Sequence, residues 1–430
     1  MKKNIPEFSA LRDIYSEVKA EMLETCSLCG HCLDVCPVYP LTSFHAEDPS
    51  EVQKSILDAL SGEPSDIAAE MADACSGCDQ CIDSCPLGLN PFFLKEVLKE
   101  QLVSSGIRKP AKPLKVGDRS IDLQELLGSL QISSSQKPWL GRIPPEPLQK
   151  DIVLFLGCSV RYQPDKGLAL LRLLEMAGMD YIAIEGGDLC CGGRYVRDGD
   201  IAQANHIAGQ LLASLGEFRP KKVIFPCSSC YKRMGQIFEM LDERPYELQH
   251  ASTFLADNMH RLNYVNRIEK TVTVHDPCDL RWKRGNTDSV RKLIEAIPGV
   301  TLAEMTHTRE STLCCGIGSH DNQHKISKEL RKRVLEEAKE TGAQVLATVC
   351  TGCHSQFCRV QKDYSFEVTH YLTLLAAAAG FTFEDKIRKY LQFETIGGIL
   401  DDAAEFIETS PYSIEEFRQV LPLFFRSAKP

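Results

Sequence analysis

CSLCGHCLDVCP, residues 26–37, sets four cysteines at fixed intervals directly before a proline: Cys26, Cys29, Cys32 and Cys36. The same spacing recurs in CSGCDQCIDSCP, residues 75–86, with Cys75, Cys78, Cys81 and Cys85. A tight loop of this kind presents three thiols to one point, and the cysteine before the proline reaches across to the point where the thiols of a second loop gather. The two stretches therefore predict one compact unit in which each loop completes the other's site.

Both stretches match the run C-x2-C-x2-C-x3-C-P that holds [4Fe-4S] cubane clusters in bacterial ferredoxins. The alternative is a pair of zinc sites, but zinc normally takes its four ligands as two separated pairs. Because the fourth cysteine in such proteins ligates the other cluster, each predicted cubane draws on both stretches. The predicted ligands are Cys26, Cys29, Cys32 and Cys85 for cubane 1, and Cys75, Cys78, Cys81 and Cys36 for cubane 2.

Composition limits the class of protein. The formal net charge of −10 argues against nucleic acid as a partner, since a phosphate binder needs a basic face. No apolar run approaches the roughly 18 residues of a membrane span, and the start, MKKNIPEF, lacks the apolar core of a secretion signal. Nineteen cysteines in such a chain indicate metal ligation or redox chemistry rather than disulfides. We expect a cytoplasmic protein without a transmembrane segment of its own, peripheral on the inner face of a membrane only through a partner.

The segments around the first two cysteine stretches are predicted to be helical. Asp48-Pro49-Ser50-Glu51 is typical of a helix start, and Pro91 opens the helical pattern FFLKEVLKEQLV. The following residues, 106–150, are rich in Pro, Ser and Lys. They are expected to form a linker with one short helix within IDLQELLGSL, residues 121–130.

From residue 151, short apolar strands alternate with amphipathic helices, and cysteines follow the strands. IVLFLG precedes Cys158, YIAIE precedes the Cys190-Cys191-Gly192 turn, and KVIFP precedes Cys227 and Cys230. The order recurs: TVTV precedes Cys278, TLAEM precedes Cys314-Cys315-Gly316, and VLATV precedes Cys350 and Cys353. Cys278 follows Cys158 by 120 residues, Cys314 follows Cys190 by 124, and Cys350 follows Cys227 by 123. We infer an internal duplication.

Each repeat is expected to gather its five cysteines at one place. Loops that follow parallel strands meet at one edge of a sheet, which is where ligands bind in open α/β folds. Thiolates so close together repel unless a cation neutralises them, so a metal cluster is expected. The glycine after each Cys-Cys pair is expected to let the backbone pass close to a bulky cofactor. The alternative, five small core residues per repeat, does not explain why the whole set is duplicated.

The pattern C…CC-G…C-x2-C, present twice, resembles the cysteine-rich CCG domain. The full layout resembles the catalytic subunit of heterodisulfide reductase with its ferredoxin-like subunit fused in front, over about residues 20–375. The resemblance implies two noncubane [4Fe-4S] clusters, and thus four clusters in all. Their ligands would be Cys158, Cys190, Cys191, Cys227 and Cys230 in repeat 1, and Cys278, Cys314, Cys315, Cys350 and Cys353 in repeat 2.

The predicted fold is a multidomain α+β protein. Residues 1–105 form a helical ferredoxin-like domain with two [4Fe-4S] clusters, followed by the linker over 106–150. Two Rossmann-like α/β CCG repeats occupy 151–265 and 266–380. Residues 381–430 form a helical C-terminal extension, with Ser413 and Glu416 in a capping box. This extension either docks a partner or closes the chain's own core, and the second role is favoured.

The resemblance implies an oxidoreductase that receives electrons through two cubanes and reduces a disulfide at two noncubane clusters. The substrate would be heterodisulfide-like, or a protein persulfide or trisulfide. The alternative is an electron-relay subunit of a flavin dehydrogenase complex, of the glycolate, lactate or glycerol-3-phosphate type, that passes electrons to quinone. Two complete five-cysteine sets favour disulfide chemistry, because such relay subunits usually lack part of one set. A flavin- or haem-containing electron-transfer subunit is the expected partner.

Several other side chains lie close in sequence to the predicted ligands. His275, His320 and His354 are the candidate proton donors in catalysis. Arg194 and Arg281 are candidates for neutralising an anionic substrate or the clusters. The remaining cysteine, Cys358, is most simply a core residue.

Overall fold

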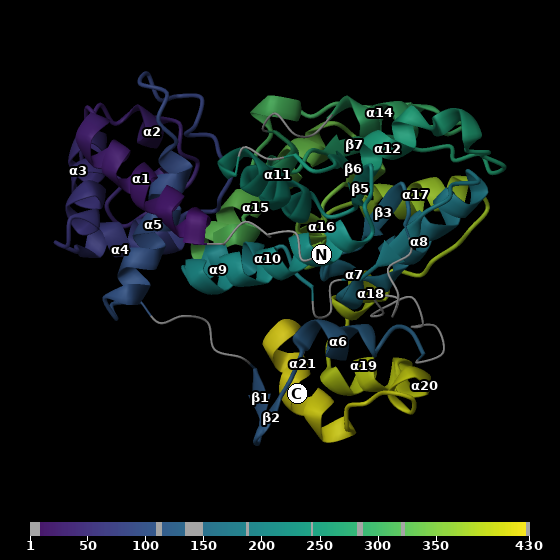
Figure 1. The fold of residues 1–430 in the computed structure, drawn as a ribbon. Helices are drawn as coiled ribbons and strands as arrows, with labels where there is room; N and C mark the ends of the chain where they lie inside the picture. The colour runs from purple at the N-terminus through teal and green to yellow at the C-terminus, as the bar shows by residue number, and fades with distance from the viewer. Residues whose placement is uncertain are drawn as a thin grey trace.

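The computed structural model describes residues 9–108, 114–133, 149–185, 189–241, 244–281, 287–319 and 323–426. The N-terminal helices, drawn in purple and blue, lie to one side of the two sheets and their covering helices, and a C-terminal group of helices, in yellow, lies below them (Figure 1). None of the helices within the described ranges is long and apolar enough to span a membrane.

The N-terminal part is helical, as predicted. Its elements are α1 (Ser9–Thr25), α2 (His31–Asp34), η1 (Tyr39–Leu41), α3 (Pro49–Leu60), α4 (Asp66–Ala74) and α5 (Pro91–Ser104). The predicted start of α3 is confirmed, since the Asp48 carboxylate accepts a 2.8 Å hydrogen bond from the Ser50 amide. The Asn90 side chain caps α5 in the same way. The first cysteine stretch therefore follows α1, and the second lies between α4 and α5.

The middle of the chain contains two four-stranded parallel sheets with the same strand order. The first runs β4 (Ile182–Ile184), β3 (Ile152–Phe155), β5 (Lys222–Phe225), β6 (Glu247–His250). The second runs β8 (Thr301–Leu302), β7 (Thr271–His275), β9 (Val345–Thr348), β10 (Glu367–His370). Corresponding strands hold corresponding places, which is the arrangement that a duplication produces.

Helices cover both sheets and pack the two repeats onto one core. Repeat 1 contributes α7 (Ser159–Tyr162), α8 (Pro164–Met176), α9 (Gly193–Asp198), α10 (Ile201–Glu217), α11 (Ser228–Met240), α12 (Ala251–Asp257) and η3 (Met259–Arg261). Repeat 2 contributes α13 (Cys278–Arg281), α14 (Asp288–Glu295), η4 (Arg309–Ser311), η5 (Ile317–Ser319), α15 (His324–Glu340), α16 (Thr351–Cys358), η6 (Gln361–Asp363) and α17 (Tyr371–Ala378). Leu170 of α8 and Leu372 of α17 belong to the same buried cluster. The two sheets are therefore fixed relative to each other by shared apolar contact.

The linker and the C-terminal residues pack against each other. Their elements are β1 (Lys115–Val116), β2 (Arg119–Ser120), α6 (Leu123–Gly128), α18 (Lys386–Tyr390), α19 (Ile396–Asp402), α20 (Ala404–Ile407) and α21 (Ile414–Phe424), and α6 lies among the yellow C-terminal helices in Figure 1. Phe417 and Leu421 of α21 share a buried cluster with Leu126 and with Cys350 and Cys353. The C-terminal residues thus close the core beneath the cysteines of repeat 2. The predicted capping box of Ser413 and Glu416 is confirmed.

This packing predicts that α21 stabilises repeat 2. Replacing the fully buried Phe417 by alanine (Phe417→Ala) should lower the free energy of unfolding by about 3–5 kcal/mol, because it removes a large apolar side chain and leaves a cavity. Ile414→Ala is the matched control, since Ile414 lies on the same helix but is 43% exposed. Urea unfolding followed by near-ultraviolet circular dichroism measures both. Equal effects of the two substitutions would contradict the assignment of α21 to the core.

Candidate iron–sulfur centres and redox cavity

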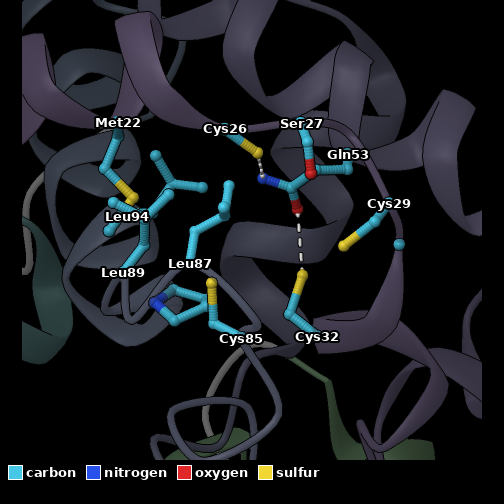
Figure 2. A pocket seen from close by; sticks show the side chains of 12 residues that line it. Met22, Cys26, Ser27, Cys29, Cys32, Gln53, Cys85, Leu87, Leu89 and Leu94 are labelled. Carbon is cyan, nitrogen blue, oxygen red and sulfur yellow. Dashed lines mark hydrogen bonds between the residues drawn. The ribbon is translucent and has the colours of Figure 1, made fainter.

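The first ferredoxin-type site is a small cavity whose wall includes four thiols, those of Cys26, Cys29, Cys32 and Cys85. Their sulfur atoms point toward the same space (Figure 2). The Gln53 side chain lies beside them, with its Oε1 3.4 Å from the Cys32 sulfur. The structure therefore brings Cys85 from the second stretch to three cysteines of the first, which is the predicted grouping.

The second ferredoxin-type site groups Cys36 with Cys75, Cys78 and Cys81. Burial, followed by the negative charges of Cys36 and Cys278, raises the pKa of Cys78 to about 12. Burial also raises the pKa of Cys81, and Cys75, Cys78 and Cys36 are the cysteines that raise it further. These mutual effects show that the four thiols lie close together, as predicted, and that Cys278 of repeat 2 is near them.

The two ferredoxin-type loops follow the same backbone course. In the first, Leu28 and Gly30 have φ angles of 58° and 75°; in the second, Gly77 and Asp79 have φ angles of 71° and 62°. Each pair holds the corresponding two positions of its loop, directly before and after the second cysteine. Leu28 and Asp79 thus occupy a left-handed conformation that non-glycine residues rarely adopt, and such strain is concentrated at functional sites.

Lys95 is a buried cation beside both ferredoxin-type sites. It lies on α5 and is 3% exposed. Burial lowers the pKa of its ammonium, but the thiolates of Cys36, Cys81, Cys75 and Cys32 outweigh burial and raise the pKa well above its usual value. A positive charge held there offsets the negative charge that thiolate ligands bring into the protein.

The five cysteines of repeat 1 form a continuous chain of thiol contacts. Hydrogen bonds join Cys158 to Cys190, Cys190 to Cys191, Cys191 to Cys230, and Cys230 to Cys227. The five cysteines of repeat 2 are joined in the same order, from Cys278 through Cys314, Cys315 and Cys353 to Cys350. The structure therefore gathers each predicted five-cysteine set in one place, and in the same arrangement twice.

Two thiols in each five-cysteine set have a lowered pKa. Hydrogen bonds from Cys190 and Cys230 lower the pKa of Cys191, although burial opposes them, and a hydrogen bond from Cys230 lowers that of Cys227. Cys315 and Cys350 of repeat 2 are affected in the same way. Since the thiolate is the form that binds metal, each set contains two positions prepared for it.

The glycines near the cysteines serve two purposes. A Cβ on Gly192 would lie 2.4 Å from the Ala204 carbonyl oxygen, and one on Gly316 would lie 2.7 Å from the Ser327 carbonyl oxygen, so the glycine directly after each Cys-Cys pair allows a close approach to the next helix. Other glycines border thiols: a Cβ on Gly157 would lie 3.2 Å from the Cys230 sulfur, one on Gly193 3.5 Å from the Cys191 sulfur, and one on Gly352 3.5 Å from the Cys350 sulfur.

A cavity of about 560 Å³ lies between the two five-cysteine sets. This volume is in the range of small-molecule sites. Apolar and aromatic side chains from the N-terminal part, the linker helix and the C-terminal helix contribute to its wall, among them Phe92, Leu127 and Phe424. The cysteines that line it are Cys75, Cys158, Cys190, Cys191, Cys227, Cys230, Cys278, Cys350 and Cys353.

The cavity wall carries more positive than negative side chains. Its acidic residues are Glu96 and Asp279, and its basic residues are Lys99, Arg194, Arg197, Lys232, Arg233, Arg359 and Arg426. Of the two arginines singled out in the sequence, Arg194 lies at the cavity, whereas Arg281 lies on α13 outside this lining. The cavity is therefore suited to a negatively charged ligand.

Buried hydrogen bonds tie the two cysteine sets together. Gln163, which follows α7, donates to the Thr351 carbonyl oxygen at 3.1 Å and to the Ser355 hydroxyl at 2.8 Å. Ser229, between Cys227 and Cys230, donates to the carboxylate of Asp279, the residue after Cys278. Each bond crosses from repeat 1 to repeat 2, so the separation of the two sets is fixed by polar contacts as well as by the core.

The candidate histidines do not line the cavity where the structure describes them. His275 is 1% exposed and contacts the Phe357 ring, and burial lowers its pKa to about 4. His354 is fully buried between Thr348 and Asp385, and burial likewise lowers its pKa to about 4. Its Nε2 lies 3.3 Å from the sulfur of Cys358, which is buried as expected. His320 lies outside the described residues. Proton donation by these histidines stays a prediction.

Four polar side chains of this region escaped prediction from the sequence: Lys95, Gln163, Lys232 and Asp279. Lys232 and Asp279 could have been noticed because they stand two residues after Cys230 and one after Cys278. Lys95 gave no comparable signal, since lysine on a helix is normally exposed.

The donor chemistry of the sites fits iron–sulfur clusters. Four sets of thiols are gathered, with all but Cys29 buried or partly buried, which suits cluster ligation. Lys95 supplies a positive charge beside the two ferredoxin-type sets, and Gly157, which lacks a side chain, borders the Cys230 sulfur of repeat 1. Among the residues that the structure describes, no group of three or more His, Cys, Asp or Glu side chains is arranged to hold a single metal ion.

Comparison with known proteins gives matches over the same segments. The 4Fe-4S dicluster domain matches residues 22–89. The cysteine-rich domain named CCG matches twice, at residues 152–235 and 272–358.

Relatives with curated names match over much of the chain. One subunit of the dihydromethanophenazine:CoB–CoM heterodisulfide reductase of Methanosarcina barkeri is 28% identical over 283 residues, 62% of this chain and 67% of that protein. The probable glycolate oxidase iron–sulfur subunit of Bacillus subtilis is 24% identical over 253 residues, 54% of this chain and 56% of that protein. A solved structure, a hypothetical protein from Helicobacter pylori, aligns with a TM-score of 0.50 at 12% identity over 89% of this chain and 78% of that chain, a likeness of fold alone.

The chain therefore carries a 4Fe-4S dicluster domain followed by two CCG cysteine-rich domains, and it is homologous to a heterodisulfide reductase subunit.

Proposed function

We propose that this chain is an oxidoreductase subunit that receives electrons at two [4Fe-4S] cubanes and reduces a disulfide at two noncubane [4Fe-4S] clusters. The observation that carries the proposal is one cavity bordered by all five cysteines of repeat 1 and by Cys278, Cys350 and Cys353 of repeat 2. A disulfide has two sulfur atoms, and this cavity allows one molecule to reach both sets. The similarity to the heterodisulfide reductase of Methanosarcina barkeri supports the same chemistry.

The proposed ligands are the cysteines that the structure groups. Reduction of one disulfide consumes two electrons and two protons and yields two thiols. When bound, the clusters would supply the electrons one at a time. The ligand sets are Cys26, Cys29, Cys32 and Cys85; Cys75, Cys78, Cys81 and Cys36; Cys158, Cys190, Cys191, Cys227 and Cys230; and Cys278, Cys314, Cys315, Cys350 and Cys353.

The remaining cavity residues would bind and orient the substrate. Arg194 and the other arginines of the wall would hold the acidic groups of a negatively charged disulfide. Phe92, Leu127 and Phe424 would exclude water from the reacting sulfur atoms. Gln163 would keep repeat 1 in register with the helix that carries Cys353, through its bonds to Thr351 and Ser355.

Electrons would enter at the first ferredoxin-type site. Cys29 is exposed, whereas Cys75, Cys78 and Cys81 are buried. A flavin- or haem-containing partner is proposed to dock there, because the homologues carry the names of subunits of oxidoreductases. The second candidate function, relay of electrons from a flavin dehydrogenase to quinone, is favoured by the similarity to the glycolate oxidase protein. An assay of disulfide reduction by reduced viologen, compared with quinone reduction, separates the two.

Metal analysis tests the number of clusters. Protein purified anaerobically should contain about sixteen irons per chain, from four clusters of four. Iron and sulfide determination with Mössbauer spectroscopy measures the content and the cluster types. A content of about eight irons, with the spectrum of ordinary cubanes alone, would remove the noncubane clusters from the proposal.

Replacement of one cysteine in each repeat tests the paired action of the two sets. Cys191→Ser and Cys315→Ser should each lower the rate of viologen-dependent disulfide reduction by at least about a thousandfold, because each removes a proposed cluster ligand from one set. Cys358→Ala is the control, since Cys358 lies outside the four sets. If the Cys191→Ser variant retained near-normal turnover, the repeat 1 set would be a relay or structural site.

The choice of electron donor tests where electrons enter. Reduced flavodoxin, a protein donor, should reduce the Cys29→Ser variant far more slowly than the wild-type chain, because a protein can approach only an exposed site. Reduced methyl viologen is small enough to enter the cavity, so its reduction of the C-terminal clusters should persist. Stopped-flow absorbance measures both rates. If the reduction rates with both donors fell equally, the ferredoxin-type domain and the CCG repeats would not accept electrons separately.

A further inference from the structure

The second ferredoxin-type loop lies directly on the Cys-Cys turn of repeat 2. Ser319, four residues after Cys315, donates a buried 2.6 Å hydrogen bond to the Ala74 carbonyl oxygen, next to Cys75. A Cβ on Gly318 would lie only 2.1 Å from the Ser76 carbonyl oxygen. The two cysteine loops therefore touch through their backbones, at a place where no side chain fits between them.

Lys232 links the Cys75–Cys81 loop to a second loop of repeat 2, the one that begins at Cys278. Its Nζ lies 2.6 Å from a carboxylate oxygen of Asp79, which stands between Cys78 and Cys81. It also lies 3.5 Å from a carboxylate oxygen of Asp279, the residue after Cys278. The same nitrogen donates to the Gly77 carbonyl oxygen at 3.3 Å and lies 4.6 Å from the centre of the Phe92 ring. Because Lys232 stands on α11 of repeat 1, its buried ammonium joins repeat 1 and a ligand loop of repeat 2 to the second ferredoxin-type loop.

Repeat 1 reaches the Cys75–Cys81 loop through the side chain of Lys232, and its backbone meets the N-terminal domain at a different place. Its α9 ends at Gly199, where a Cβ would lie 2.7 Å from the Lys99 carbonyl oxygen on α5. Arg108, after α5, donates to the Asp198 carbonyl oxygen. These contacts are made by a helix end against a helix, away from the Cys75–Cys81 loop. The two duplicated repeats are therefore attached to the electron-carrying domain in unequal ways.

We propose that Lys232, Gly318 and Ser319 are positioning residues that seat the Cys75–Cys81 loop on repeat 2, so that electrons reach repeat 2 before repeat 1. The inference rests on the proposed function and adds an order to it. In each transfer the group held by Cys36, Cys75, Cys78 and Cys81 is oxidised by one electron, and the group held by repeat 2 is reduced by one. No atom or proton needs to move. Repeat 1 then receives electrons across the cavity, and the two sets are not interchangeable.

Gly318→Ala tests most directly whether the close contact between Gly318 and the Cys75–Cys81 loop positions the two loops for electron transfer. Its added methyl must separate the two loops, and a longer path between two redox centres slows electron transfer. We expect electron arrival at repeat 2 to slow several-fold, while reduction of the ferredoxin-type clusters is unchanged. Gly216→Ala is the matched control, because Gly216 has nothing within 4 Å of the added methyl. Freeze-quench electron paramagnetic resonance after mixing with reduced flavodoxin measures both phases.

Magnetic coupling supplies a readout that does not depend on turnover. In the wild-type chain, reduced anaerobically without any disulfide, the second cubane and the repeat 2 cluster should relax each other strongly in pulsed electron paramagnetic resonance. Lys232→Met and Gly318→Ala should weaken this coupling, and Lys232→Arg should restore most of it by keeping the charge. Unchanged coupling and unchanged transfer in both Lys232→Met and Gly318→Ala would overturn the proposal, whether or not the chain reduces disulfides.

Replacing one ligand cysteine in each repeat tests the order of electron transfer and leaves Lys232, Gly318 and Ser319 unchanged. With Cys314→Ser, pre-steady-state reduction of the repeat 1 cluster should be lost. With Cys190→Ser, reduction of the repeat 2 cluster should proceed at the wild-type rate. The opposite pattern would show that electrons enter through repeat 1. This comparison remains decisive if Gly318→Ala fails to fold.

Discussion

Buried negative charge is the condition to which the rest of this fold is adapted. Thiolates are costly to bury unless positive charge lies near them. Lys95 acts on thiolates of both ferredoxin-type sets, and Arg233 and Arg331 act on Cys191 and Cys315. These cations are themselves almost fully removed from solvent and stay there because each has polar partners or thiolates around it. The helices that carry them are therefore fixed by the chemistry of the cysteine sets as well as by apolar packing.

The cavity between the two sets depends on every part of the chain. The repeats supply the thiols, α5 supplies Phe92 and Lys99, the linker helix α6 supplies Leu127, and the C-terminal residues supply Phe424 and Arg426. The same C-terminal segment closes the core under Cys350 and Cys353. Parts that look like separate modules in the sequence thus form one site. A single continuous space next to both sets is what distinguishes a reductase acting on two sulfur atoms from a chain of separate relay centres.

The sequence predicted the cysteine groups well because spacing determines how thiols meet. The strands before Cys158 and Cys227 were predicted because they are continuous apolar runs. β6 and β10 were missed, because ELQH and EVTH are polar and each ends in a histidine that caps the next helix. The positions of Lys95 and Lys232 could not be predicted, since only tertiary packing places thiolates or carboxylates around a buried ammonium. For the same reason the sequence could not show that His275 and His354 lie behind the cavity wall.

The account stands on the claim that both five-cysteine sets act on one disulfide in their shared cavity. An anaerobic crystal structure of the cluster-loaded chain, reduced and soaked with a small acidic disulfide, tests this most directly. We predict one sulfur atom of the substrate beside each set, with its acidic groups near the arginines of the wall. A disulfide bound at one set alone, or a cavity without substrate in crystals that still turn over, would contradict the claim.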